Sequence, residues 1–117
     1  MWRLQPIFTA YLLELEGTNK FYAGSTLTSE LKKRFQCHVD GEGSFWTAAH
    51  RPIRIIRTWD GLTSQQGFEK EQLLTETLIE KFQNLEACRG GRWNFPKNST
   101  WWVPPRLRHL VIEKPPL

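Results

Sequence analysis

The feature of the sequence that most constrains the fold is a long amphipathic helix in the second half of the chain. The spacing of apolar residues predicts this helix from Gln66 to about Leu85. Its apolar stripe consists of Leu74, Leu78, Phe82 and Leu85, with Leu73 and Ile79 flanking it. A stripe of this kind packs against other elements of a core. The chain has 117 residues, which is about the size of one domain, so we expect one core.

Strand-forming residues dominate the beginning of the chain. Residues 7–15 and 20–24 are expected to be strands, and Glu16-Gly17-Thr18-Asn19 between them is expected to be a turn. This order predicts a hairpin. Hydroxyl side chains at 25–29 then offer N-caps for a helix that runs over about 29–39.

The middle of the chain continues the alternation of helices and strands. Two glycines within residues 40–44 end the first helix. A third strand is expected over 53–59, and Asp60-Gly61 is expected to turn the chain before the long helix. The order of elements predicts an α+β domain: a three-stranded, mostly antiparallel sheet flanked by helices.

The end of the chain has a different composition. Arg89-Gly90-Gly91-Arg92 is expected to be a loop, because adjacent glycines are unfavourable inside helices and strands. The sequence beyond it contains five prolines, Pro96, Pro104, Pro105, Pro115 and Pro116. We therefore expect a domain over 1–93 and a Pro/Trp-rich tail over 94–117 that packs on or extends it, with a short element at 107–112.

Charge and cysteine content narrow the class of protein. The net charge of +4 and the pI near 9.3 permit a polyanionic partner. The two cysteines are too few for a disulfide framework and are expected to be reduced thiols. No apolar run reaches the roughly 18–20 residues that cross a bilayer, and the first residues lack the apolar region of a signal peptide. A cytoplasmic protein without a membrane partner is expected.

Several residues could together cleave a phosphodiester. The two tyrosines, Tyr11 and Tyr22, both fall in the predicted hairpin, and Arg34 and His38 lie one turn apart on the predicted first helix. The long helix adds carboxylates. Phenols, a guanidinium, an imidazole and a carboxylate can activate water, offset charge on a phosphate and hold a divalent metal. Each of these residues also has an ordinary structural explanation.

The order and spacing of these residues resemble the GIY-YIG nuclease superfamily. The similar segments cover most of the chain, from Thr9 to Trp93. They are Thr9-Ala10-Tyr11, Tyr22-Ala23-Gly24, Arg34 with His38, the stretch from Gly41 to Ile56, and Arg89-Gly90-Gly91-Arg92-Trp93. The last of these is similar to the ending of some phage and viral members. The resemblance implies a small stand-alone enzyme, similar to phage or mobile-element members, and members with this layout also include repair-like and restriction-like enzymes.

The chain departs from this family at a few positions. Thr9-Ala10 stands where the family has glycine-isoleucine, and Ala23 stands where it has isoleucine. These are backbone or packing positions, so we expect the changes to be tolerated. The metal-binding glutamate must come from the long helix. Glu71 is our choice because the small residue Gly67 precedes it by four and Thr75 follows it by four, as in similar sequences. Glu69 and Glu76 are the alternatives.

The resemblance implies a role for each residue in a metal-dependent DNA endonuclease. Glu71 would bind one Mg²⁺ or Mn²⁺ ion. Tyr11 would act as or support the general base, and Tyr22 would position the phosphate or the water. Arg34 would neutralise charge on the phosphate, and His38 would assist by proton transfer or orientation.

A further set of residues is expected to contact nucleic acid, because backbone amides and guanidinium groups bind phosphates and aromatic rings stack on bases. These residues are Gly24, Ser25, Lys32, Lys33, Trp46, Arg51, Arg54, Arg89, Gly90, Gly91 and Arg92. The expected partner is DNA, and the sequence leaves open whether the DNA is single-stranded, duplex or branched and whether RNA is accepted. Sequence preference would come from loops and tail, from a partner, or from a homodimer.

Two other functions remain open at this point. The altered first triplet favours a catalytically eroded module on the same scaffold that binds nucleic acid without cleaving it. The Trp-rich tail favours a protein-interaction or inhibitor module.

Overall fold

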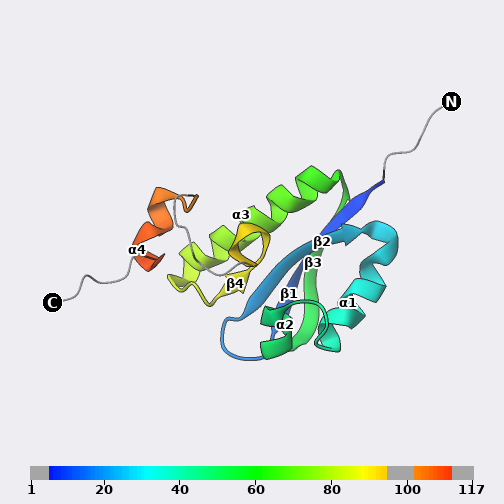
Figure 1. The fold of residues 1–117 in the computed structure, drawn as a ribbon, viewed down its shortest axis with the longest axis horizontal. Coiled ribbons are helices and arrows are strands. Elements are labelled where there is room, and N and C mark those ends of the chain that lie inside the picture. The colour runs from blue at the N-terminus through cyan, green and yellow to red at the C-terminus, as the bar shows by residue number, and fades with distance from the viewer. Residues whose placement is uncertain (1–5, 95–101, 112–117) are drawn as a thin grey trace.

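The computed structural model describes residues 6–94 and 102–111, and its centre is a four-stranded mixed sheet. The strands are β1 (Phe8–Leu15), β2 (Phe21–Leu27), β3 (Pro52–Leu62) and β4 (Cys88–Arg89), in the order β3-β1-β2-β4. In Figure 1 the long helix α3 (Ser64–Phe82) lies on one side of the sheet, and α1 (Leu31–Val39) and α2 (Phe45–Ala49) lie on the other. The predicted α+β class is thus observed.

The sheet has one more strand than predicted. Cys88 and Arg89 form β4, which pairs in parallel with Phe21 and Tyr22 at the edge of β2. The prediction of a three-stranded sheet, with Arg89 in a loop, is therefore wrong at this point. Two residues carry no recognisable strand pattern, and this pairing depends on the return of the chain after α3, which local sequence does not encode.

The first two strands form the predicted antiparallel hairpin, in which Tyr11 pairs with Gly24 and Leu13 pairs with Tyr22. The turn uses positive φ angles at Gly17 and Asn19, two residue types that tolerate this conformation. β2 runs on to Leu27, three residues beyond its predicted end.

The third strand pairs with the other side of β1 and is longer than predicted. Asp60 and Gly61 do not turn the chain, because β3 continues to Leu62, which pairs with Phe8. The register shifts between Phe8 and Ala10, and Gly61 adopts a φ of 73° there. An irregularity of this kind lets a strand pass through a sequence that otherwise favours a turn.

The helix after the hairpin begins with a 3-10 turn over Thr28–Glu30 and continues as α1. It ends before Gly41, as expected. The short helix α2 was not predicted; Ser44 caps its N-terminus by accepting the amide N–H of Thr47 on its side chain.

The long helix α3 matches the prediction in its centre and differs at its ends. It begins at Ser64 because Thr63 and Gln66 form a capping box, in which each side chain bonds the backbone of the other residue. It stops at Phe82, before the predicted end at Leu85, because Gln83 adopts a left-handed conformation with a φ of 51°.

The core fills both faces of the sheet. Tyr11, Leu13, Leu15 and Tyr22 pack toward α1 and α2. Leu12, Ala23 and Cys88 pack toward α3, where Leu74 and Leu78 of the predicted stripe cover them. Alternate residues of the hairpin therefore serve opposite faces, as the pleat of a strand requires.

The last described segments pack on the end of α3. They are the 3-10 turns Gly91–Asn94 and Pro105–Leu107 and the helix α4 (Arg108–Val111). Ile79, Trp93, Val103 and Leu107 form a separate buried cluster, and Trp102 lies edge-on against Trp93. Residues 95–101 and 112–117 of the predicted tail, including Ile112 of the expected short element, lie outside the described residues. No helix in the described part of the chain could span a membrane.

Candidate active site

The predicted catalytic residues come together at the edge of β2. β4 pairs only with Phe21 and Tyr22, so this edge is open beyond Tyr22. One face of the hairpin presents Tyr11 and Tyr22, and α3 approaches from the other face with Glu71. The Glu71 carboxylate lies close enough to the tyrosines on the opposite face to raise the pKa of both through its charge.

The two tyrosines are adjacent and almost fully buried, with ring centroids 6.5 Å apart. Burial raises the pKa of Tyr11, and the neighbouring Tyr22 adds to the effect. Burial also raises the pKa of Tyr22, helped by the charge of Glu71. Gly24 makes room for this arrangement, since a Cβ there would lie 2.4 Å from the Tyr11 Oη. Both phenols are therefore protonated at neutral pH.

A chain of hydrogen bonds runs from Tyr11 into α2. The Tyr11 Oη lies 2.9 Å from His38 Nε2, and His38 Nδ1 lies 2.8 Å from Thr47 Oγ1. Burial lowers the pKa of His38 to about 4, and the nearby Arg34 contributes, so the imidazole is neutral at pH 7. The Thr47 hydroxyl can donate to the Ser44 carbonyl, 3.4 Å away. With that assignment His38 donates from Nδ1 to Thr47 and accepts the Tyr11 proton at Nε2.

Arg34 projects from α1 toward both tyrosines. Its Nη2 donates to the Gly43 carbonyl at 3.0 Å, which fixes the guanidinium at the wall of the site. Burial alone would lower the pKa of Arg34, but the hydroxyls of Tyr11 and Tyr22 raise it overall. The positive charge in turn limits the rise in pKa of both phenols. Arg34 is thus a fixed cation in the site.

Glu71 is held between β2 and the loop after β4. Its Oε2 accepts the Ser25 hydroxyl at 2.7 Å, and the backbone N–H of Gly91 also bonds it. Gly67 lies one turn earlier on α3, where a Cβ would come within 3.1 Å of the Ser25 side chain. The small residue lets the helix approach β2 closely enough for Glu71 to reach Ser25. Burial raises the pKa of Glu71, and its hydrogen bonds and Arg34 oppose that rise.

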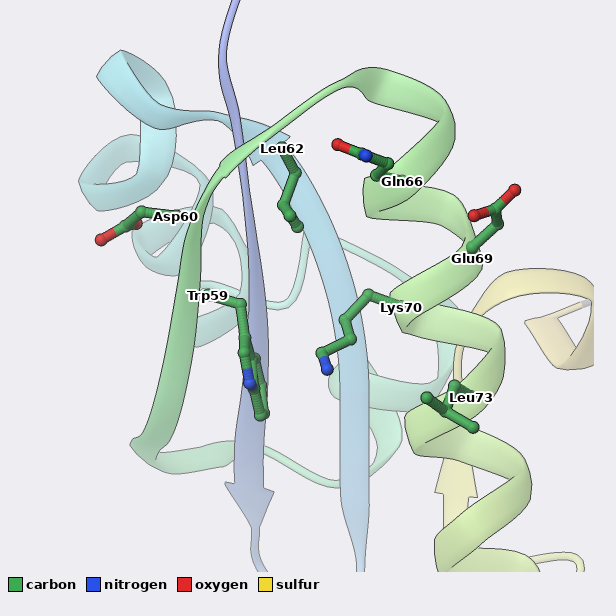
Figure 2. Close-up of a pocket in the computed structure, with 7 residues that line it drawn as sticks. All are labelled: Trp59, Asp60, Leu62, Gln66, Glu69, Lys70 and Leu73. Carbon is green, nitrogen blue, oxygen red and sulfur yellow. The ribbon is translucent and has the colours of Figure 1, made fainter.

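The two alternative glutamates lie elsewhere. Glu69 is exposed, bonds Gln65, and points away from the sheet on the outer side of α3 (Figure 2). Figure 2 also shows Lys70 turned from the same helix toward Trp59 of β3, across a groove separate from the tyrosines. Glu76 is buried and accepts hydrogen bonds from Gln72, Trp93 and Arg106.

One residue of the site, Asn94, was not predicted from the sequence. Asn94 follows the Arg89–Trp93 motif directly, and its side chain bonds the hydroxyl of Tyr22. It helps to line a cavity of about 470 Å³ together with Tyr22 and Arg34. The other residues lining this cavity are Gly43, Ser44, Phe45, Trp46 and Arg89. The position next to the motif was the available signal for Asn94.

The glycine pair places the loop that carries Asn94. A Cβ on Gly90 would lie 2.4 Å from the Ala23 carbonyl, and one on Gly91 would lie 2.5 Å from Gln72 Oε1. Gly91 also has a φ of 54°. The pair is therefore required for the close approach to β2 and α3 that brings the Gly91 amide to Glu71.

The residues expected to contact nucleic acid do not form one surface. Trp46 and Arg89 lie at the cavity, with the Arg89 guanidinium 4.7 Å from the Trp46 ring centroid. Others lie apart from it. Lys32 and Lys33 are exposed on another side of α1, Arg51 bonds the Val39 carbonyl, Arg54 pairs with Glu14, and Arg92 lies beside Gln72 and Glu76.

Glu71 is the carboxylate of this site that could hold a hard cation together with a phosphate. No group of three or more His, Cys, Asp or Glu side chains that could hold a metal is found among residues 6–94 and 102–111. Mg²⁺, however, retains several waters and often uses one or two carboxylates together with substrate phosphates. Glu71 offers such a carboxylate, and burial leaves its charge incompletely compensated.

Comparison with known proteins adds a relative. The chain is 31% identical over 72 residues to a UPF0213 protein of Bacillus velezensis, and the match covers 61% of this chain and 71% of that protein. The chain belongs to the UPF0213 family. No family model matches this UPF0213 protein, and no solved structure matches it significantly. The geometry of the site is therefore the main evidence for its function.

Proposed function

We propose that this UPF0213 protein is a divalent-metal-dependent DNA endonuclease with a GIY-YIG-type site. The observation that carries the proposal is the convergence of Tyr11, Tyr22, Arg34 and Glu71 at the open edge of β2. They come from β1, β2, α1 and α3, four separate elements. Packing alone does not require two phenols, a guanidinium and a partly uncompensated carboxylate to share one site.

The departures from the family pattern are compatible with activity. Thr9 and Ala10 are fully buried in β1, and the Thr9 hydroxyl bonds Asp60 and Thr28. Ala23 is also fully buried, under α3. All three positions pack the fold and leave the hydroxyls of Tyr11 and Tyr22 in the site, which weighs against the eroded module.

Hydrolysis of a phosphodiester forms one P–O bond to water and breaks another, so one proton must leave the water and one must reach the leaving oxygen. Tyr11 donates a hydrogen bond to His38 and is hydrogen-bonded by the Arg34 side chain, which leaves one lone pair of its oxygen to accept a hydrogen bond from that water. A proton taken by the Tyr11 oxygen is matched by one passed to His38 Nε2. Tyr11 and His38 would thus take up the proton of the attacking water, and the leaving oxygen would take its proton from solvent water.

Arg34 and Glu71 handle charge. The Arg34 guanidinium would bind the phosphate and offset the negative charge that grows on it in the transition state. Glu71, supported by Ser25 and the Gly91 amide, would hold the Mg²⁺ or Mn²⁺ ion. When bound, such an ion supplies further positive charge at the phosphate oxygen. Tyr22, tied to Asn94, would position the phosphate or the water.

The test is cleavage of labelled single-stranded, duplex and junction DNA in Mg²⁺ or Mn²⁺, with EDTA as the metal-free control. Arg34→Ala and Glu71→Gln should each lower the cleavage rate about 10²–10³-fold, as the loss of a transition-state contact usually does. Glu69→Gln, on the outer side of the same helix, is the matched control and should cleave normally. Equal cleavage by all three variants, or by none including the wild type, would refute the proposal.

A further inference from the structure

The most exposed large hydrophobic side chain in the described part of the chain lies at the rim of the candidate active site. Phe45 is 97% exposed. It lines the same cavity as Tyr22, Arg34 and Asn94. A phenylalanine left in water gives up the stabilisation that burial would provide. Its position beside the site therefore calls for an explanation in terms of binding.

The exposure does not come from a loose segment, because α2 is firmly attached on its inner side. Trp46 Nε1 donates to the Phe21 carbonyl of β2 at 2.9 Å, and the Trp46 ring lies against Arg89. Thr47 is fully buried and bonds both His38 and the capping Ser44. The residues that follow Phe45 thus fix the helix to the sheet and to His38. Phe45 is therefore exposed on a helix whose position is well defined.

The cavity beside Phe45 has the charge of a phosphate site. Arg34 and Arg89 line it. Arg34 is a fixed cation, as its contact with Gly43 shows, and Arg89 is partly buried against Trp46. An aromatic ring next to cations matches a nucleotide, which carries a flat base and an anionic phosphate. Stacking of a base on an aromatic side chain contributes about 1–3 kcal/mol.

We propose that Phe45 stacks on an unpaired nucleobase next to the phosphate bound at Arg34, and that the site thereby prefers single-stranded or locally unpaired DNA. In a duplex both faces of a base are covered by its stacked neighbours, so a protein ring reaches a face only when the base leaves the stack. This inference rests on the proposed function, because it identifies the substrate of the same site.

The experiment measures binding separately from cleavage. Oligonucleotides that contain 2-aminopurine, single-stranded or fully paired, are titrated in EDTA with the wild type, Phe45→Ala and Phe45→Trp. The wild type should bind the single strand more tightly than the duplex and change the 2-aminopurine fluorescence on binding. Phe45→Ala should weaken single-strand binding about 5- to 150-fold and remove the fluorescence change, and Phe45→Trp should retain both.

Controls keep the outcomes distinct. Phe68→Ala removes another exposed phenylalanine, on α3 outside this cavity, and should bind like the wild type. Single-strand affinity unchanged in Phe45→Ala would overturn the inference, as would equal affinity of the wild type for both DNA forms. A change in self-association without a change in DNA binding would also overturn it, and would indicate a protein contact at Phe45.

Cleavage assays in Mg²⁺ separate this inference from the proposed function. Loss of stacking in Phe45→Ala, together with no cleavage of any DNA by the wild type, would refute the endonuclease and leave the stacking site standing. Cleavage by the wild type, with unchanged single-strand binding and cleavage in Phe45→Ala, would refute the stacking site alone.

Discussion

Replacing the glutamates of α3 one at a time should separate a structural carboxylate from a catalytic one. Glu76 is buried, and its carboxylate accepts the Trp93 Nε1–H at 3.2 Å and pairs with Arg106 at 3.3 Å. Glu76→Ala leaves the buried indole N–H of Trp93 without its partner, which costs about 1–3 kcal/mol. The pair with the half-exposed Arg106 adds no more than about 1 kcal/mol. We expect a total loss of about 1–4 kcal/mol in the free energy of unfolding.

The isosteric change Glu76→Gln should cost less, about 1–2 kcal/mol, because the amide oxygen can still accept the Trp93 N–H. Glu71→Gln should change the free energy of unfolding by less than about 1 kcal/mol, since the Ser25 hydroxyl keeps an acceptor. Its cleavage rate should nevertheless fall about 10²–10³-fold. Glu76→Gln should thus mainly lower the free energy of unfolding, whereas Glu71→Gln should mainly lower the cleavage rate.

Urea unfolding followed by circular dichroism measures the first quantity, and DNA cleavage in Mg²⁺ measures the second. Glu69→Gln serves as the control in both, because its side chain is exposed and bonds only Gln65 among the described contacts. The reasoning would be refuted if Glu76→Gln unfolded like the wild type but no longer cleaved, while Glu71→Gln cleaved normally. That result would make Glu76 the metal-binding glutamate.

Three further predictions follow from the packing and the charges. The pKa of His38 is about 4 in the fold and near 6.5 in the unfolded chain, so the unfolded chain binds a proton first as the pH falls. The free energy of unfolding should therefore be highest above pH 6.5 and fall as the pH drops toward 4. Urea titrations at several pH values measure this slope, and His38→Gln should flatten it. Leu107→Ala truncates a fully buried side chain and should lower the free energy of unfolding by about 2–5 kcal/mol, which unfolding curves would reveal or contradict. If Lys32 and Lys33 contact phosphates, their double alanine variant should reduce the slope of log affinity against log salt by about one to two; an unchanged slope would remove them from the interface.

The parts of the fold that the sequence predicts well are those specified by local pattern. The hairpin follows from two runs of strand formers around a turn, and the centre of α3 follows from Leu74 and Leu78 at helical spacing. The predicted start of α3 at Gln66 lies two residues after the observed start at Ser64, although Thr63 and Gln66 have the spacing of a capping box. Its end depends on the left-handed Gln83, a residue type that gives no such signal.

The parts that the sequence does not predict depend on contacts between distant segments. β4 is a strand only because Cys88 and Arg89 return beside β2, and a two-residue pairing leaves no pattern. β3 passes through Asp60-Gly61, although this dipeptide favours a turn, because Leu62 pairs with Phe8 on the neighbouring strand. Tertiary pairing thus overrides local preference at both places.

In the candidate site too, some residues could be placed from local sequence, whereas others depend on contacts between distant segments. Tyr11 and Tyr22 were placed together by hairpin register, and Arg34 and His38 by helix spacing, both of which are local rules. The choice among the glutamates was not local. It depends on where α3 crosses β2, which Gly67 sets through its contact with Ser25.

The short β4 connects the fold to the chemistry. If β4 continued beyond Arg89 it would cover the edge of β2 at Ala23 and Gly24, which β4 leaves unpaired beside Tyr22. The chain instead leaves the sheet at Gly90 and turns through Gly91, whose N–H reaches Glu71, and Asn94 then reaches Tyr22. Residues outside the site stabilise this path of the chain.

Trp93 lies between the two residues that reach the site, Gly91 and Asn94, and it is buried with Val103 and Leu107 while its indole bonds Glu76. The C-terminal segment therefore contributes to the packing that positions this loop. The residues of that segment are remote from the tyrosines in sequence and share no contact with them among the described interactions. They act on the site by fixing the loop, which is why a pattern search centred on the tyrosines and Arg34 does not find them.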